Sequence, residues 1–229
     1  MNAILDKIKG QLIVSCQALP TEAMYSADYP IMKHFAQAAL RGGAGGVRAN
    51  TVRDINAIRA EVPLPVIGII KREFGDNPVY ITPTLAEVRE LAQTGVEIIA
   101  LDATSRERPD GVGLDELFAR CKTEFPQQLF MADCSTPEEG LHAWEIGFDL
   151  IGTTLSGYTA YTKGTKNPNL AMMRALAEHG CRVIAEGGIW TPEDLQNAMQ
   201  CGVHAAVVGT AITRPMEITQ RFADALKGA

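Results

Sequence analysis

Eight short apolar runs recur along the chain, and most neighbouring runs are separated by a stretch with the pattern of an amphipathic helix. The runs span residues 12–17, 45–49, 66–71, 97–103, 128–133, 149–154, 182–187 and 205–210. Runs of this kind are typical of strands that are buried on both faces of a parallel sheet. Parallel strands need crossover helices, and eight such units in a row close into a (β/α)8 barrel. We therefore predict an α/β fold, a single-domain (β/α)8 TIM barrel over residues 1–229.

Helix start signals between the runs support this alternation. Thr84 precedes an apolar-periodic stretch with Glu87 three residues later, which is a capping box. Thr136 and Thr191 are each followed by a proline and two acidic residues, as expected at helix N-termini. The first ten residues, MNAILDKIKG, predict a short amphipathic helix. An open doubly wound sheet is the alternative fold, but no GxGxxG motif opens the first unit.

Composition excludes several classes of function. The chain is 46% hydrophobic and 21% charged, with a net charge of −6 and no long basic run, which argues against a nucleic-acid partner. No apolar run approaches the roughly 20 residues that a membrane span needs, and the first residues do not form a signal peptide. The five cysteines are scattered without a CxxC pair, which favours reduced thiols in the cytoplasm and no metal site.

Polar residues stand where the predicted strands end, and in a barrel these ends surround the active site. In chain order they are Gln17, Arg48, Lys71, Asp102, Asp133, Thr153, Glu186 and Gly209. Strand alternation places Lys71 on the same face as Ile67 and Ile69, so that its charge points into the barrel. Buried charges must pair, shift their pKa or meet a ligand. Asp102 either faces the same site or only caps the following turn, whereas we assign Arg72 and Glu73 to a loop.

Two glycine-containing loops follow the last two strands. Backbone N–H groups in these positions bind phosphate in many barrels, and glycine lets the backbone approach a ligand closely. The predicted phosphate site consists of Gly187, Gly188, Gly209, Thr210, Ala211 and Arg214. The expected ligand is a small phosphorylated molecule, such as a sugar phosphate.

The same segments closely resemble a known family. IVSCQALP, GGAGGVRAN, PVIGIIKRE, ALDAT, MADCST, IGTTLSGYT, AEGGI and VVGTAITRP are similar to the motifs of N-acylglucosamine-6-phosphate 2-epimerases, also called N-acetylmannosamine-6-phosphate 2-epimerases. The resemblance covers nearly the whole chain. It implies a ribulose-phosphate-binding barrel that interconverts N-acetylmannosamine 6-phosphate and N-acetylglucosamine 6-phosphate in bacterial sialic-acid catabolism, without a cofactor.

The resemblance also implies roles for the strand-end residues. Lys71 would take or return the proton at C2 of the ring-opened sugar, and Glu186 would assist ring opening and supply or accept the second proton. Arg48 and Gln17 would hold O1 as an oxyanion site. The remaining substrate contacts would be Asp133, which would hold sugar hydroxyls or orient Lys71, and Thr153 and Tyr158, which would reach the N-acetyl group.

Three alternatives stay open on the sequence. Lys71 could be the only base, and the roles of Lys71 and Glu186 could be exchanged. A Schiff-base lyase or synthase would use Lys71 as its nucleophile, and a phosphosugar-binding barrel would have no activity. The C-terminal segment MEITQRFADAL offers an apolar helix face for a homodimer, although that face could equally close the barrel.

Overall fold

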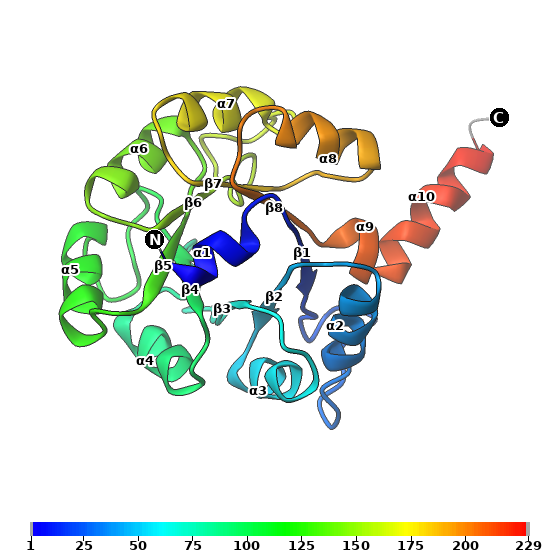
Figure 1. The fold of residues 1–229 in the computed structure, drawn as a ribbon, viewed down its shortest axis with the longest axis horizontal. Helices are drawn as coiled ribbons and strands as arrows, with labels where there is room; N and C mark the ends of the chain where they lie inside the picture. The colour runs from blue at the N-terminus through cyan, green and yellow to red at the C-terminus, as the bar shows by residue number, and fades with distance from the viewer. Residues whose placement is uncertain (1, 228–229) are drawn as a thin grey trace.

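The computed structural model describes residues 2–227 and contains one closed barrel of eight parallel strands (Figure 1). Each strand pairs with the next in sequence, and β8 pairs with β1. The predicted (β/α)8 barrel is therefore confirmed. The strands are β1 (Leu12–Cys16), β2 (Gly46–Asn50), β3 (Val66–Ile69), β4 (Ile98–Asp102), β5 (Leu129–Asp133), β6 (Leu150–Gly152), β7 (Val183–Glu186) and β8 (Ala205–Val208).

Helices cover the outside of the barrel, and three of them begin as the sequence predicts. Thr84, Thr136 and Thr191 each cap a helix through a complete capping box. The helices formed by the described residues are α1 (Ala3–Ile8), α2 (Met32–Arg41), α3 (Val52–Glu61), α4 (Leu85–Gln93), α5 (Leu114–Glu124), α6 (Pro137–Glu145), α7 (Leu170–Glu178), α8 (Pro192–Met199), α9 (Thr210–Thr213) and α10 (Pro215–Lys227).

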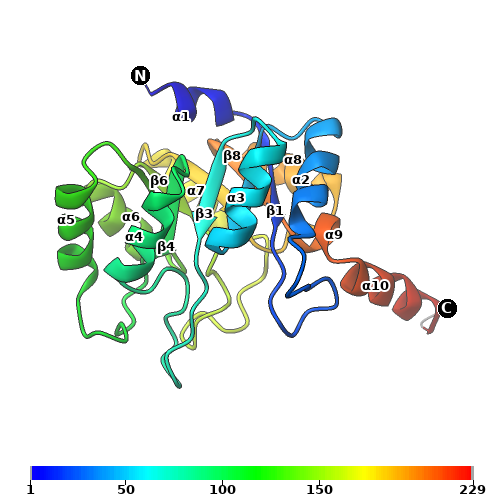
Figure 2. The same ribbon diagram turned by 90° about the horizontal axis from the view of Figure 1, so that it is seen from below.

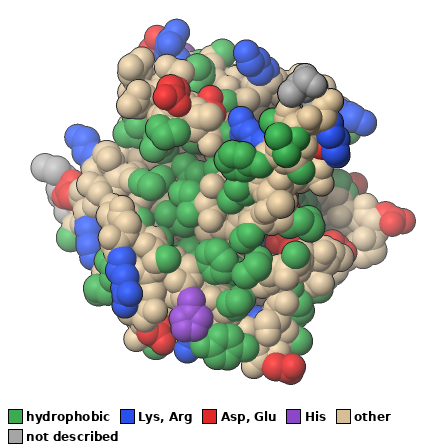
Figure 3. Space-filling model, turned by 90° about the vertical axis from the view of Figure 1, so that its right-hand side faces the viewer, with side chains coloured by type: hydrophobic (Ala, Val, Ile, Leu, Met, Phe, Trp, Pro, Cys, Tyr) green, Lys and Arg blue, Asp and Glu red, His purple; other side chains and the backbone are tan. Residues whose placement is uncertain are grey.

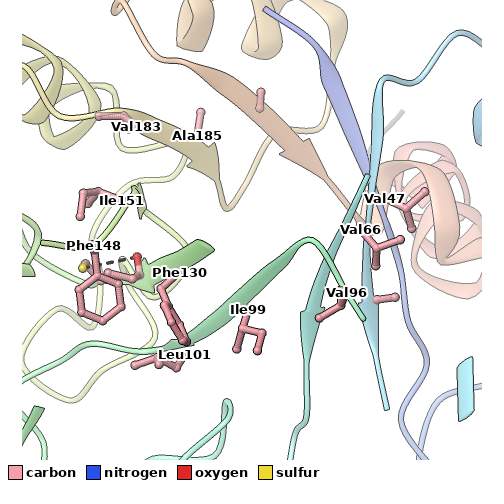
Figure 4. Close-up of a cluster of buried hydrophobic side chains, with 14 of the residues drawn as sticks. Val47, Val66, Val96, Ile99, Leu101, Phe130, Phe148, Ile151, Val183 and Ala185 are labelled. Carbon is pink, nitrogen blue, oxygen red and sulfur yellow. Dashed lines mark hydrogen bonds between the residues drawn. The ribbon is translucent and has the colours of Figure 1, made fainter. Parts of the chain in front are cut away.

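Side chains alternate between two cores along every strand. Ile67, Ile69 and Met131 belong to the core inside the barrel, while residues between them pack outward against the helices. Figure 4 shows part of this outer core, including Phe130 and Ile151 from neighbouring strands. The same alternation puts Lys71 and Asp133, which lie two residues after Ile69 and Met131, on the inner face, as we predicted for Lys71.

The two ends of the barrel differ. Helix α1 lies across the amino ends of the strands, where Leu5 and Ile8 join the inner core and His204 Nε2 lies 2.9 Å from the Leu5 carbonyl oxygen. The long connections after β1, β3 and β6 extend from the opposite end (Figure 2). Because α1 closes one end, a ligand reaches the barrel interior from the carboxyl ends of the strands. No helix among residues 2–227 combines the length and the apolar character that crossing a membrane requires.

Helix α10 projects away from the barrel (Figures 1 and 2). None of its residues is buried, and Phe222 and Leu226 expose 73% and 81% of their surface. Figure 3, which views the molecule from the side on which α10 projects, shows hydrophobic side chains gathered across this face. The alternative that this helix closes the barrel is therefore wrong, because α1 closes one end and α10 lies outside.

Candidate active site

A cavity of about 380 Å³ opens at the carboxyl ends of the strands. Its wall includes residues from or just after β1, β2, β3, β6, β7 and β8, so that it lies over the barrel axis. The predicted site residues that line it are Gln17, Arg48, Lys71, Tyr158, Glu186, Gly187, Gly188, Gly209, Thr210 and Arg214. The fold thus brings together groups that are up to 197 positions apart in the sequence, from Gln17 to Arg214.

Arg48 joins three strands at the floor of the cavity. Its side chain reaches from β2 across the inner core, and only 1% of it is exposed. Nη1 donates hydrogen bonds to Asp133 Oδ1 (3.0 Å) and Glu186 Oε2 (2.8 Å), and Nη2 donates to Asp133 Oδ2 (2.6 Å). Arg48 Nε has no hydrogen-bond partner among the described residues. The guanidinium therefore holds two carboxylates at once.

Glu186 is an unusual carboxylate in this network. Burial is the largest effect and raises its pKa, and the nearby charge of Asp133 raises it further. The positive charges of Arg48 and Lys71 act in the opposite direction, but the net pKa stays above the usual range. A carboxyl group with a raised pKa is suited to exchange protons near neutral pH.

The backbone at Lys71 is fixed by several neighbouring segments. The Asn50 side-chain oxygen accepts a hydrogen bond from the Lys71 N–H (2.9 Å), and Lys71 forms an isolated antiparallel bridge with Ile81. The regular strand β3 ends two residues earlier, at Ile69. Lys71 therefore points into the cavity from an extension of β3 whose backbone contacts the chain around residue 50 on one side and the chain around residue 81 on the other.

Arg72 lies in the loop after Lys71, as predicted, and its side chain is paired with two carboxylates. Its guanidinium contacts Glu87 (2.5 Å) and Glu90 (2.9 Å) on α4, and its N–H donates to the Tyr80 carbonyl (2.9 Å). The Glu87 side chain is fully buried and also belongs to the capping box of α4. The charge of Arg72 therefore ties the residue after Lys71 to the start of a helix.

The environment lowers the pKa of Lys71 to about 8. Burial is the largest cause because it disfavours the ammonium form, and the positive charges of Arg48 and Arg214 add to it. Glu186 and Glu22 oppose the change. An amine with a pKa near 8 is neutral and protonated in comparable amounts at mildly alkaline pH, so it can give or take a proton.

The two glycine loops lie on one side of the cavity, but glycine serves packing there. A Cβ on Gly188 would lie 2.5 Å from Asn167 Cβ, and a Cβ on Gly209 would lie 3.2 Å from Ser15 Cβ. Gly188 also has a φ of +70°, which disfavours other residues. Both loops are therefore held tightly by their neighbours, while their exposed edges face the cavity. Ala211 is not part of the cavity wall.

Arg214 already has an anionic partner at this edge. Its Nη2 lies 2.5 Å from Glu22 Oε1, and Glu217 lies at 3.9 Å. The other Glu22 oxygen accepts a hydrogen bond from the Leu19 N–H (2.9 Å). Glu22 thus links the loop after β1 to the residue that precedes α10.

Two predicted substrate contacts, Asp133 and Thr153, do not reach the cavity surface, and Asp102, whose role the sequence left open, caps a turn. Asp133 is fully buried behind Arg48. The Thr153 hydroxyl donates to the Glu186 carbonyl (2.8 Å) and accepts from the Glu186 N–H (3.0 Å), so it points between strands and outside the cavity. Asp102 accepts hydrogen bonds from Thr104 N and Oγ1 and pairs with Arg106, which makes it the cap of a turn.

Several cavity residues were not predicted from the sequence. Thr154 lines the wall where Thr153 was expected, and Glu22, Tyr80 and Trp190 lie on connections whose course the sequence does not define. The position of Thr154 could have been predicted, because it is two residues beyond Gly152 and strand alternation puts both residues on the inner face. Gln17 lies where predicted, and its Oε1 is buried without a partner while Nε2 donates to Ser15 Oγ (2.8 Å). Within residues 2–227 no three His, Cys, Asp or Glu side chains are grouped to hold a metal ion.

Comparison with known proteins gives consistent matches in sequence. A family model described as "Putative N-acetylmannosamine-6-phosphate epimerase" matches residues 32–228. A protein from Listeria innocua named "Putative N-acetylmannosamine-6-phosphate 2-epimerase" is 48% identical over 229 residues, covering 99% of this chain and 98% of the relative. A protein of the same name from Clostridium perfringens is 49% identical over 225 residues, covering 98% of this chain and 100% of the relative.

Solved structures are also similar to this chain. The structure of the N-acetylmannosamine-6-phosphate 2-epimerase from Clostridium perfringens superposes with a TM-score of 0.91 at 48% identity, covering 97% of this chain and 96% of that one. A thiamine phosphate pyrophosphorylase from Pyrococcus furiosus superposes with a TM-score of 0.61 at 15% identity, covering 94% and 92% of the two chains. At that identity the second likeness shows a shared barrel fold alone.

Proposed function

Because the chain belongs to the N-acetylmannosamine-6-phosphate epimerase family, we propose that it interconverts N-acetylmannosamine 6-phosphate and N-acetylglucosamine 6-phosphate. The observation that carries the proposal is the convergence of Lys71, Arg48 and Glu186 in one cavity with Arg214 at its edge. These four residues provide the groups that an epimerisation at C2 requires. It offers two groups that exchange protons, a cation for a developing negative charge and a cation for phosphate.

The reaction begins with opening of the sugar ring, since the C2 proton is acidic only when C1 is an aldehyde. Removal of that proton leaves an enolate whose negative charge resides largely on O1. Arg48 and Gln17 both line the cavity, so these two residues supply the groups that hold O1. Return of a proton to the opposite face of C2 inverts the centre. Only protons move, so the chemistry requires no redox cofactor.

Lys71 and Glu186 are the two groups that exchange the protons. We assign one face of C2 to each of them, with a single proton shared by the pair in the active state. The lowered pKa of Lys71 and the raised pKa of Glu186 bring the two groups closer in acidity, which makes transfer in both directions accessible. Asp133 acts through Arg48, because its carboxylate is fully engaged below the cavity surface.

The phosphate of the substrate belongs at the Arg214 edge of the cavity. The loop edges at Gly187, Gly188, Gly209 and Thr210 line this region, and Arg214 contributes the positive charge. Binding the phosphate there fixes one end of the open chain while C2 reacts, which is an orientation effect. Tyr158, which lines the cavity from the long β6–α7 connection, is our choice for a contact with the N-acetyl group.

The direct test is conversion by the purified protein. N-acetylmannosamine 6-phosphate should yield the gluco epimer in proton NMR spectra, and folded Lys71→Ala protein should not form it. A Schiff-base reaction is the second candidate, because Lys71 has the low pKa of a nucleophilic amine. Borohydride added with substrate would then label Lys71 covalently, whereas epimerisation leaves the lysine unlabelled. Binding without turnover would indicate a phosphosugar-binding barrel.

We further propose that the protein acts in the cytoplasm as a homodimer. The cytoplasmic assignment is supported by Cys16, Cys121, Cys134, Cys181 and Cys201, which are all buried free thiols. The dimer is supported by α10, an amphipathic helix with no buried residue and with Phe222 and Leu226 exposed. A second copy of the chain is the partner we assign to this face (Figure 3).

A further inference from the structure

Thr154 stands between the two carboxylates of the active site. Its hydroxyl lies 2.7 Å from Asp133 Oδ1 and 3.1 Å from Glu186 Oε2, so its single proton is shared between the two carboxylates. Thr154 also lines the cavity, next to the proposed reaction centre. The hydroxyl therefore occupies a position where two negative charges approach one another. Among residues 2–227, the Arg48 guanidinium is the other side-chain group that hydrogen-bonds both carboxylates.

The local fold is built around this hydroxyl. Strand β6 ends at Gly152, and a Cβ on Gly152 would lie 3.0 Å from Thr154 Oγ1 and 3.1 Å from Asp133 Oδ1. Met131 Cε would lie closer still, so any larger residue at position 152 would displace the methionine, the threonine or the aspartate. Thr153 holds the neighbouring backbone through its two hydrogen bonds to Glu186. The adjacent threonines thus fix Glu186 twice, once at its backbone and once at its carboxylate.

The contacts of Glu186 are unequal between its two oxygens. Oε2 accepts hydrogen bonds from Arg48 Nη1 and Thr154 Oγ1, while Oε1 accepts none from residues 2–227. Because Glu186 lines the cavity, the oxygen without a protein partner is the one left for the substrate. Arg48 alone could hold Oε2, but a single contact would let the carboxylate rotate about it. The Thr154 contact removes that freedom.

We propose that Thr154 is a positioning residue that holds the Glu186 carboxylate for proton transfer to and from C2. This inference rests on the epimerase function proposed above. Thr154 acts through Glu186, so its loss should lower kcat and leave binding of the phosphorylated substrate nearly unchanged. It should also change the acidity of Glu186, because a hydroxyl that donates to a carboxylate stabilises the ionised form.

The direction of that change follows from the surroundings. Burial and Asp133 raise the pKa of Glu186, and Arg48, the Thr154 hydroxyl and Lys71 lower it. Removing the hydroxyl takes away one stabilising contact and leaves the two carboxylates less shielded from one another. The pKa of Glu186 should therefore rise. The other charged or titratable groups on the cavity wall are Glu22, Tyr80, Tyr158 and Arg214, and none of them changes in the experiment.

The test compares Thr154→Val, which keeps the shape and removes the hydroxyl, with Thr154→Ser, which keeps the hydroxyl. We expect Thr154→Val to lower kcat about 10- to 100-fold, the range for losing a hydrogen bond to a charged group, with KM within about twofold of the wild type. The pH below which kcat/KM falls on the acidic side of its profile (the acidic limb) should rise. Thr154→Ser should retain most of the wild-type kcat and the wild-type acidic limb.

A matched control comes from the same connection. Thr165 donates a hydrogen bond to the Thr162 carbonyl (2.7 Å) and does not line the cavity, so Thr165→Val should retain the wild-type kcat and pH profile. Thr154→Ala serves as a second hydroxyl-free variant if Thr154→Val does not fold, with folding checked by circular dichroism. A folded Thr154→Val protein with wild-type kcat and an unmoved acidic limb would overturn the inference while the proposed function stands.

The two proposals fail in different ways. Folded wild-type protein that does not convert the substrate would overturn the epimerase function, and with it the catalytic role of Thr154. Active wild-type protein whose Thr154→Val and Thr154→Ala variants lose kcat without a change in the acidic limb would exclude the Glu186 contact as the cause. Titration of the Glu186 carboxyl by carbon-13 NMR gives the pKa in wild type and variant directly, and an equal pKa in both would overturn the inference as well.

Discussion

Arg48 and Asp133 form a two-point ion pair inside the barrel, with nitrogen–oxygen distances of 3.0 and 2.6 Å and almost no exposed surface on either side chain. Such a pair is costly to break from one side, because the remaining charge stays buried. We expect Asp133→Asn to lower the free energy of unfolding by about 3–5 kcal/mol, measured by urea denaturation. The exposed pair of Arg89 and Glu124 provides a control, and Arg89→Gln should leave the urea midpoint unchanged. Equal midpoints for both variants would contradict this account.

The pH dependence of the reaction tests how the protons are shared. If Lys71 and Glu186 act with one proton between them, activity falls when the pair loses that proton. Burial and the charges of Arg48 and Arg214 lower the pKa of Lys71 to about 8, so kcat/KM should decline above about pH 8 in both reaction directions. A single neutral Lys71 base predicts the opposite sign, with activity rising through pH 8. Initial rates between pH 6 and 10 separate the two mechanisms.

The contact between Glu22 and Arg214 predicts a gain in affinity on mutation. A phosphate that binds Arg214 must compete with a carboxylate at 2.5 Å. Glu22→Gln removes the competing charge and should lower the inhibition constant of inorganic phosphate about two- to fivefold, the range that about 0.5–1 kcal/mol gives for a partly exposed pair. Arg214→Gln should raise the same constant. Weaker phosphate binding by Glu22→Gln would show that Glu22 supports the site instead of competing for it.

The exposed face of α10 predicts self-association. Phe222 and Leu226 would become buried in a homodimer, and their replacement by serine should shift the protein toward the monomer in sedimentation velocity experiments. Phe74→Ser is the control, since Phe74 is an exposed aromatic residue on the connection after β3, and Figure 2 shows this connection apart from α10. A monomeric wild-type protein at micromolar concentration would contradict the proposed dimer.

Most of the fold could be predicted from the sequence because local and global signals agree. Each apolar run became a strand, and the capping boxes at Thr84, Thr136 and Thr191 begin helices. Alternation from Ile67 and Ile69 also placed Lys71 in the cavity, because the chain stays extended beyond the end of β3 and bridges Ile81. These features depend on periods of two and 3.6 residues, which the sequence displays directly.

The features that could not be predicted depend on tertiary contacts or on the exact strand face. Alternation from Gly152 puts Thr154 on the inner face, so Thr153 lies outside the cavity wall. The ion pairs of Arg72 could not be predicted, because its partners Glu87 and Glu90 lie on a helix 15 and 18 residues away. Glu22 lies on the long connection after β1, where no periodicity shows which side chains turn toward the barrel.

The most direct test of the central claim is incubation of the purified protein with N-acetylmannosamine 6-phosphate in D2O. Proton transfer at C2 by Lys71 and Glu186 predicts that deuterium appears at C2 together with the gluco epimer, and that folded Lys71→Ala protein catalyses neither process. Folded wild-type protein that produces no deuterium at C2 and no epimer would contradict the account, and deuterium exchange retained in Lys71→Ala would remove Lys71 from its role.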